Sequence, residues 1–181
     1  MHKVIAVVGM TGSGKSEVTR MLREQDCVTV RFGDITDAEL KRRGWPLNEE
    51  NERIVREALR REHGMDAYAR LSLPRIEEQL DKSSVAIDGL YSWEEYKFLK
   101  EYYGVRLIIV AVWAPPRLRY KRLSRRTVRP LTPDEARNRD YAEIENLNKG
   151  GPICMADYTI LNNGTFEELQ RQVIHVTEAL L

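Results

Sequence analysis

The feature that most constrains this chain is a glycine-rich loop close to its first residue. The apolar run 4–8 is followed at 9–16 by the sequence GMTGSGKS, which has the spacing G-x-x-x-x-G-K-[ST]. Glycines let the backbone turn tightly and aim its N–H groups at phosphate oxygens, while the lysine and serine add a positive charge and a metal ligand. A helix-compatible segment, 17–24, comes directly after the loop. The order of strand, loop and helix predicts a phosphate-binding loop.

Bulk composition indicates one domain and argues against several classes of partner. A chain of 181 residues, 42% of them hydrophobic, can bury one full core, so we expect a single domain over residues 1–181. The formal net charge is only +1, which gives no overall attraction to nucleic acid or to an anionic membrane. The first residues read as a strand and not as a leader peptide, and no run approaches about 18 apolar residues. We expect a cytoplasmic protein that is a monomer or a weak homodimer.

Five short apolar runs are the strand candidates of the chain. Most of them are nearly continuous in valine, isoleucine, alanine and leucine, as expected for strands covered on both faces. Segments with helical periodicity separate most of them, and this alternation predicts a three-layer α/β/α domain with a five-stranded parallel sheet. Capping boxes at 92–95, 132–135 and 165–168 mark three helix starts. The strand candidates are 3–8, 27–31, 84–88, 105–113 and 157–161.

A long helical insertion, residues 36–82, separates the second and third strand candidates. It is broken near Gly44 and Gly64, and Pro74 should kink or restart a helix. The insertion is too long for a plain crossover. Two interpretations are open: a solvated helical pair whose arginines form i,i+4 ion pairs, or a subdomain that binds a substrate. Its arginines include Arg42, Arg43, Arg53, Arg56, Arg60 and Arg61.

A strongly basic segment follows the fourth strand candidate. Residues 117–129 carry seven positive charges in thirteen positions and no acidic side chain. A nucleic-acid arm is one interpretation, but the chain is nearly neutral overall and Tyr120 is the one aromatic side chain there that could stack on a base. The segment follows a strand at the carboxyl edge of the predicted sheet, where ligands of such folds bind. We therefore expect residues 117–139 to form a lid over small-molecule nucleotides, with neither nucleic acid nor a membrane as partner.

These motifs together resemble the P-loop nucleotide kinases, and within them the dephospho-CoA kinase and adenylate-kinase-related branch. The resemblance covers nearly the whole chain. It implies the strand order 2-3-1-4-5 and transfer of the γ-phosphoryl group of ATP. The residues that carry it are the phosphate loop, Gly33-Asp34, Asp88-Gly89, Arg119, Arg122-Leu123, Arg126, Arg139-Asp140, Ala156-Asp157-Tyr158 and Asn162-x-Gly164-Thr165.

The resemblance implies roles for the residues on the ATP side. Lys15 would bridge the β- and γ-phosphates, Arg122 would lie against the adenine, and Arg126 and Arg139 would reach the phosphates and the transferring group. Cations suit this task because a loose phosphoryl-transfer transition state spreads its charge over the oxygens. The expected ATP-binding residues are Gly9, Met10, Thr11, Gly12, Ser13, Gly14, Lys15, Ser16, Glu17, Arg122, Arg126 and Gly164.

The expected cofactor is Mg²⁺, which would enter with ATP. Ser16 would ligate the ion directly, and Asp88, at a strand end, would hold a magnesium-bound water. Asp88 has a second interpretation, because Asp-Gly is a common turn pair and the carboxylate could cap the next helix.

The acceptor side departs from the family pattern at two positions. Many nucleoside monophosphate kinases carry arginines where this chain has Asp37 and Tyr91, and both arginines clamp the acceptor phosphate. A hydroxyl acceptor would instead need a general base, and Asp34 is the candidate, with a helix N-cap as its alternative role. The expected acceptor-binding residues are Asp34, Arg42, Arg53, Arg60, Asp88, Gly89 and Tyr91, and the expected catalytic residues are Lys15, Asp34, Arg126 and Arg139.

The predicted activity is that of an ATP-dependent nucleotide kinase. A nucleoside monophosphate is the favoured acceptor, because the adenylate-kinase-related resemblance runs through the insertion, including residues 60–67. A dephospho-CoA kinase that phosphorylates a ribose hydroxyl is the alternative. A nucleotide-binding regulator or slow ATPase is the alternative from another class.

Overall fold

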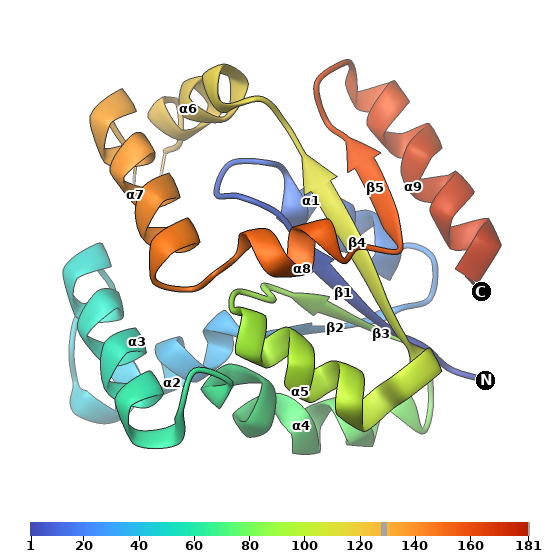
Figure 1. The fold of residues 1–181 in the computed structure, drawn as a ribbon, viewed down its shortest axis with the longest axis horizontal. Helices are drawn as coiled ribbons and strands as arrows, with labels where there is room; N and C mark the ends of the chain where they lie inside the picture. The colour runs from blue at the N-terminus through green and yellow to red at the C-terminus, as the bar shows by residue number, and fades with distance from the viewer. Residues whose placement is uncertain (128–129, 181) are drawn as a thin grey trace.

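A parallel sheet lies at the centre of the structure, a computed structural model that describes residues 1–127 and 130–180 (Figure 1). Its strands are β1 (Val4–Val8), β2 (Val28–Arg31), β3 (Val85–Asp88), β4 (Leu107–Trp113) and β5 (Tyr158–Leu161). They are arranged in the order β2-β3-β1-β4-β5, and neighbours run parallel. The predicted α/β class and the order 2-3-1-4-5 are confirmed.

The strand register brings the functional segments to one edge of the sheet. Val7 of β1 pairs with Asp88 of β3 on one side and with Val110 of β4 on the other. The loop that follows Val8 therefore emerges beside Asp88, as it must in a sheet whose strands all run the same way.

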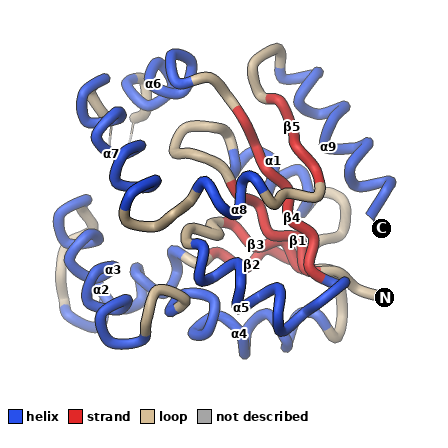
Figure 2. Tube along the Cα trace, in the orientation of Figure 1, coloured by secondary structure: helices blue, strands red, loops and turns tan. Residues whose placement is uncertain are grey.

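Helices cover both faces of the sheet, as Figure 2 shows for the blue helices around the red strands. On one face α1 (Lys15–Arg23) and α9 (Phe166–Leu180) form a core with the strand side chains Ile5, Val7 and Val110. On the other face α4 (Ala67–Leu80) and α5 (Trp93–Tyr103) pack on Val4, Ala6 and Val8. Alternate residues of β1 thus face opposite cores, and all five are fully buried, which explains its continuous apolar sequence.

The insertion forms three helices, separated at the two predicted breaks near Gly44 and Gly64. Helix α2 spans Gly33–Arg43 and α3 spans Glu49–His63, with a left-handed Gly44 closing α2 and Gly64 ending α3 as predicted. Helix α2 starts three residues earlier than expected. Pro74 lies inside α4 and does not break it, because buried side chains such as Tyr68 and Ile76 anchor the helix on both sides of the proline.

The basic segment is largely helical. Helix α6 (Pro116–Ser124) and α7 (Pro133–Glu145) pack on each other above the carboxyl edge of the sheet, and the short α8 (Gly150–Cys154) leads back to β5 (Figure 1). Val128 and Arg129 of the predicted lid lie outside the described residues. The capping boxes at 92–95, 132–135 and 165–168 are present as reciprocal hydrogen bonds. A single 3-10 turn at Gly104–Arg106 delays the start of β4 to Leu107.

Candidate active site

The phosphate loop connects β1 to α1 in a conformation that needs its glycines. Gly14 has φ +103, and a Cβ atom there would lie 2.1 Å from Nδ2 of Asn162. At Gly9 a Cβ atom would lie 2.4 Å from the carbonyl oxygen of Val112. The backbone oxygen of Val112 leaves no room for a side chain at Gly9, while the positive φ disfavours one at Gly14, so both positions need glycine.

The loop lysine is folded onto its own loop. Nζ of Lys15 donates to the carbonyl oxygens of Gly9 at 2.8 Å and Met10 at 3.1 Å. Burial, with Lys149 and Arg139 nearby, lowers the pKa of Lys15 to about 7, against the opposing pull of Glu143 and Asp88. An anionic ligand would raise the pKa of Lys15 again, because phosphate oxygens favour the charged lysine.

A carboxylate on α7 ties the loop to the rest of the site. Glu143 accepts hydrogen bonds from the backbone N–H of Thr11, at 3.2 Å, and from its hydroxyl group. The same carboxylate lies 3.0 Å from Nζ of Lys149 and 3.6 Å from Nε of Arg139. Burial opposes the ionisation of Glu143, but Lys149 and Lys15 outweigh it and hold the pKa of Glu143 at about 2. Glu143 is therefore an anion throughout the neutral range.

Arg119, one of the arginines that carry the family resemblance, forms buried hydrogen bonds within the protein. It is 4% exposed and donates two parallel hydrogen bonds of 2.7 Å to Asp140. A third bond of 3.0 Å reaches the carbonyl oxygen of Thr11. Arg119 thus joins α6, α7 and the phosphate loop, as a bidentate guanidinium can.

The expected adenine end of the site forms around Asn162. Nη2 of Arg122 donates to both the backbone and side-chain oxygens of Asn162 at 3.0 Å, and Nδ2 of Asn162 donates to Ser13 at 2.8 Å. Gly164 lies two residues further along the same turn. Arg122 is thus brought next to the loop through Asn162, and Arg126 follows shortly after the end of α6.

The predicted magnesium ligands lie at the same edge of the sheet. Ser16 is exposed in the first turn of α1, next to Glu17, which pairs with Arg20 at 3.2 Å. Burial raises the pKa of Asp88, although Lys15 and Arg31 oppose this. Within the described residues there is no cluster of three or more His, Cys, Asp or Glu side chains able to hold a metal. Two protein ligands fit an ion bound chiefly by phosphates and water, as Mg²⁺ usually is.

A cavity of about 690 Å³ lies between α3 and α7 and adjoins the phosphate loop through Glu143. The predicted residues Arg53, Arg60, Tyr91 and Arg139 line it. Its other charged lining residues are Glu49, Arg56, Glu57, Arg61, Glu135 and Glu143.

Arg60 is the most deeply placed arginine of this cavity. Its side chain is 12% exposed, lies 5.0 Å from the ring centroid of Tyr68 and is 4.0 Å from the buried carboxylate of Glu95. Its Nε has no hydrogen-bond partner among the described residues. Burial raises the pKa of Glu95 to about 7, with Arg60 acting in the opposite direction. Arg60 therefore lines the cavity and carries a buried Nε without a partner among the described residues.

Four predicted acceptor residues are not among the lining residues of this cavity: Asp34, Arg42, Asp88 and Gly89. Arg42 is 72% exposed and pairs with Glu39 on its own helix at 2.7 Å, outside the cavity. Asp34 lies in the first turn of α2, whose N-cap is Phe32, so Asp34 does not cap the helix. Gly89, with φ +106, follows Asp88 and lies against the ring of Tyr91.

The carboxylate of Asp34 is held by two arginines. Arg31 donates to one oxygen at 3.1 Å and Arg75 to the other at 2.7 Å. Arg31 also donates to Asp37 at 2.6 Å, so Asp37 belongs to the same ion-pair cluster. The acidic side chain at position 37 is thus compensated within the fold.

Sequence reasoning missed Glu143 and Lys149. Glu143 follows Arg139 by one helical turn, which was a weak signal in a helix rich in charges. Lys149 is fully buried, although lysine is almost never buried without a partner. Nothing in the local sequence distinguishes it from a surface lysine.

Comparison with known proteins agrees with this architecture. Residues 5–146 match the model of the AAA domain family. A UPF0200 protein from Thermococcus onnurineus (strain NA1) is 36% identical over 182 residues, covering 98% of this chain and 98% of the relative. The chain belongs to the AAA domain and UPF0200 families.

Solved structures similar to this UPF0200 chain share its fold. TT1252 from Thermus thermophilus aligns with a TM-score of 0.66 at 21% identity and covers 100% of both chains. A shikimate kinase from Bacteroides thetaiotaomicron aligns with a TM-score of 0.62 at 15% identity, covering 98% of each chain. The fold of this chain is therefore that of the P-loop kinases. Among the described residues, no helix combines the length and apolar character needed to span a membrane.

Proposed function

We propose that this UPF0200 chain is an ATP-dependent kinase that phosphorylates a nucleoside monophosphate. The observation that carries the proposal is the position of the arginine-lined cavity. Glu143 lines that cavity and also binds Thr11 of the phosphate loop, so an acceptor in the cavity would lie next to the donor phosphates. Positioning two anionic substrates in this way is most of what an enzyme contributes to phosphoryl transfer.

An anionic acceptor suits the charges of the cavity. Arg60 and Arg53 line it from α3 and Arg139 lines it from α7. Arg60 has an unused donor, and guanidinium groups bind phosphate through paired hydrogen bonds. Arginines from α3 would then replace the clamp that the sequence lacks at Asp37 and Tyr91.

The surroundings of Asp34 favour a phosphate acceptor over a hydroxyl. A phosphate monoester with a second pKa near 6 is mostly dianionic at neutral pH and needs no base. A ribose hydroxyl would need one, but both oxygens of Asp34 accept hydrogen bonds from arginines. Deprotonating a substrate through Asp34 would require at least one of these contacts to break.

On the donor side we propose that ATP binds with Mg²⁺. Ser16 and Asp88 would hold the ion, which neutralises phosphate charge when bound. Lys15 would leave the carbonyl oxygens of Gly9 and Met10 for the phosphates. Arg126 and Arg139 would stabilise the transferring group, while Arg122 would lie beside the adenine.

A coupled assay with purified full-length chain tests this function. ATP consumption and product formation would be followed with each nucleoside monophosphate, with dephospho-CoA and without acceptor. We expect one monophosphate to stimulate turnover and to appear as its diphosphate. Phosphorylated dephospho-CoA would favour the hydroxyl kinase, while acceptor-independent turnover or none at all would favour a slow ATPase or a nucleotide-binding regulator.

A further inference from the structure

Lys149 is the most deeply buried cation outside the motifs that led to the proposed function. Its side chain has an exposed fraction of 0% and lies in the turn between α7 and α8. Nζ lies 3.0 Å from Glu143 and 5.1 Å from the ring centroid of Tyr91. Tyr91 and Glu143 both line the acceptor cavity, so Lys149 lies directly behind the cavity wall.

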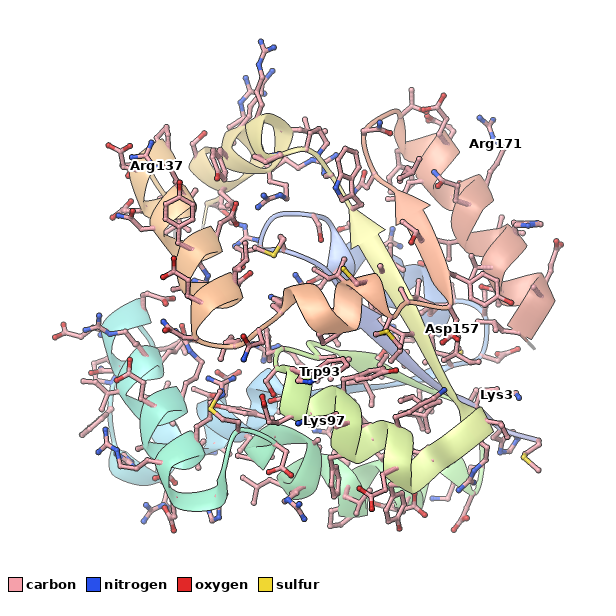
Figure 3. All side chains as sticks on the ribbon, viewed as in Figure 1. Lys3, Trp93, Lys97, Arg137, Asp157 and Arg171 are labelled. Carbon is pink, nitrogen blue, oxygen red and sulfur yellow. The ribbon has the colours of Figure 1, made fainter. Side chains whose placement is uncertain are left out.

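The turn that carries Lys149 is fixed on both sides. Its backbone N–H donates to the carbonyl oxygen of Glu143 at 3.2 Å, and the N–H of Trp93 donates to Leu147 at 3.1 Å. Trp93, labelled in Figure 3 at the start of α5, packs so closely on α8 that a Cβ atom at Gly151 would lie 2.6 Å from its ring. Contacts with α5, α7 and α8 therefore fix the backbone of the turn that carries the Lys149 ammonium group.

Glu143 presents an electrostatic problem that Lys149 solves. A carboxylate bound to Thr11 places a negative charge beside the loop that is expected to hold phosphates. In a buried site such a charge repels phosphate strongly, because little water screens it. Lys149 supplies the opposite charge, with its Nζ 3.0 Å from a carboxylate oxygen of Glu143.

We propose that Lys149 is a positioning residue for phosphoryl transfer, whose buried charge lets Glu143 hold the phosphate loop against the acceptor cavity without repelling the substrates. The inference rests on the proposed kinase function. Lys15, Arg139 and Lys149 surround the single carboxylate of Glu143, so the net charge of this group is positive and favours a phosphate. Burying this pair is not needed for folding as such, since apolar replacements of buried ion pairs are often tolerated.

The test removes the two charges separately and together. The variants are Lys149→Met, Lys149→Arg, Glu143→Gln and the double variant Glu143→Gln/Lys149→Met. Lys97→Met is the matched control, because Lys97 is an exposed lysine of α5 whose contact with Glu94 is 3.9 Å (Figure 3). Three quantities are measured for each: the equilibrium Kd for Mg-ATP, the thermal midpoint, and kcat for the best acceptor from pH 5 to pH 9.

Removing Lys149 takes away the 3.0 Å partner of Glu143 and leaves Arg139, at 3.6 Å, and Lys15 to balance the carboxylate. Mg-ATP binding should therefore weaken about tenfold or more in Lys149→Met, as it does when one partner of a buried pair is lost. The substitution should also make kcat rise as the pH falls, because protonation of Glu143 then removes the repulsion. The double variant should recover Kd to within about threefold of the wild type, since no unpaired charge remains. Lys149→Arg should keep most of the affinity, and Lys97→Met should change nothing.

Two results would overturn the proposal. If the double variant binds Mg-ATP as poorly as Lys149→Met, Lys149 acts directly on the phosphates and not through Glu143. If Lys149→Met binds Mg-ATP as the wild type does, the pair is purely structural. The double variant and Lys149→Arg decide the matter even if Lys149→Met does not fold. The affinity series needs no acceptor, so it stays informative if the wild type phosphorylates none of the compounds tested and the kinase proposal fails.

Discussion

Glu143 and Thr11 are 132 positions apart in the chain, yet the carboxylate accepts hydrogen bonds from both the N–H and the hydroxyl group of the threonine. This contact joins the phosphate loop to α7, the helix that also carries Arg139. Any ligand that moves α7 therefore acts on the loop as well. Glu143 thus connects the phosphate loop to the wall of the cavity between α3 and α7.

Lys15→Ala should lower turnover on the order of 100-fold or more, because it removes an electrostatic contact with the transferring group. The folded state should tolerate the change, since the hydrogen bonds of the Lys15 ammonium go to carbonyl oxygens of its own loop. Steady-state kinetics at saturating ATP measure the effect, with Lys97→Ala as control. Turnover close to the wild-type value would remove Lys15 from the chemistry.

ATP binding should take up a proton above neutral pH. The pKa of Lys15 is about 7 in the free protein, and bound phosphates raise it, so the lysine is neutral before binding at pH 8 and charged afterwards. Affinity should therefore fall as the pH rises through 7, by up to about tenfold per unit. Calorimetry in two buffers of different ionisation enthalpy would detect the proton. Lys15→Arg should bind without proton uptake, because arginine is always charged; equal uptake in this variant would assign the proton to another group.

Substitutions of two arginines of the insertion, Arg60 and Arg42, should differ sharply in their effect on the KM for the acceptor. Arg60→Met should raise the acceptor KM by about tenfold or more, since Arg60 lines the cavity with a free donor and a charged hydrogen bond contributes roughly 1.5–3 kcal/mol. Arg42→Met should leave kcat and KM unchanged, because Arg42 pairs with Glu39 outside the cavity. Acceptor titrations at fixed ATP separate the two. Equal effects of both substitutions would mean that the acceptor does not bind in this cavity.

Asp34→Asn should change kcat by less than about threefold if the acceptor attacks through a phosphate, because no base is then required. An amide in place of the carboxylate weakens the contacts with Arg31 and Arg75, so a modest loss of stability is the main effect expected. The surface pairs involved contribute only about 0–1 kcal/mol each. Measuring kcat together with ATP affinity is the decisive step. A collapse of kcat with normal ATP binding would instead identify Asp34 as a general base for a hydroxyl acceptor.

The phosphate loop could be predicted from the sequence because its signals are local. The spacing of Gly9, Gly14 and Lys15 imposes one backbone path, and the apolar run before it can only be a buried strand. The expected helix break at Pro74 was wrong, since burial of Tyr68 and Ile76 carries α4 through the proline. The local sequence predicts that a proline destabilises a helix, but it does not show the burial of neighbouring side chains that offsets this loss.

The sequence by itself determined the fold class and the phosphate loop, because periodicity, glycine positions and capping boxes act over a few residues, while the strand order was implied by the family resemblance. Only the tertiary structure decided which charges meet. In the structure Arg42 lies outside the cavity, and both oxygens of Asp34 accept hydrogen bonds from arginines. Lys149 is buried beside Glu143. The physical reason is that electrostatic contacts depend on distance in space and on burial, and neither can be read from separation along the chain.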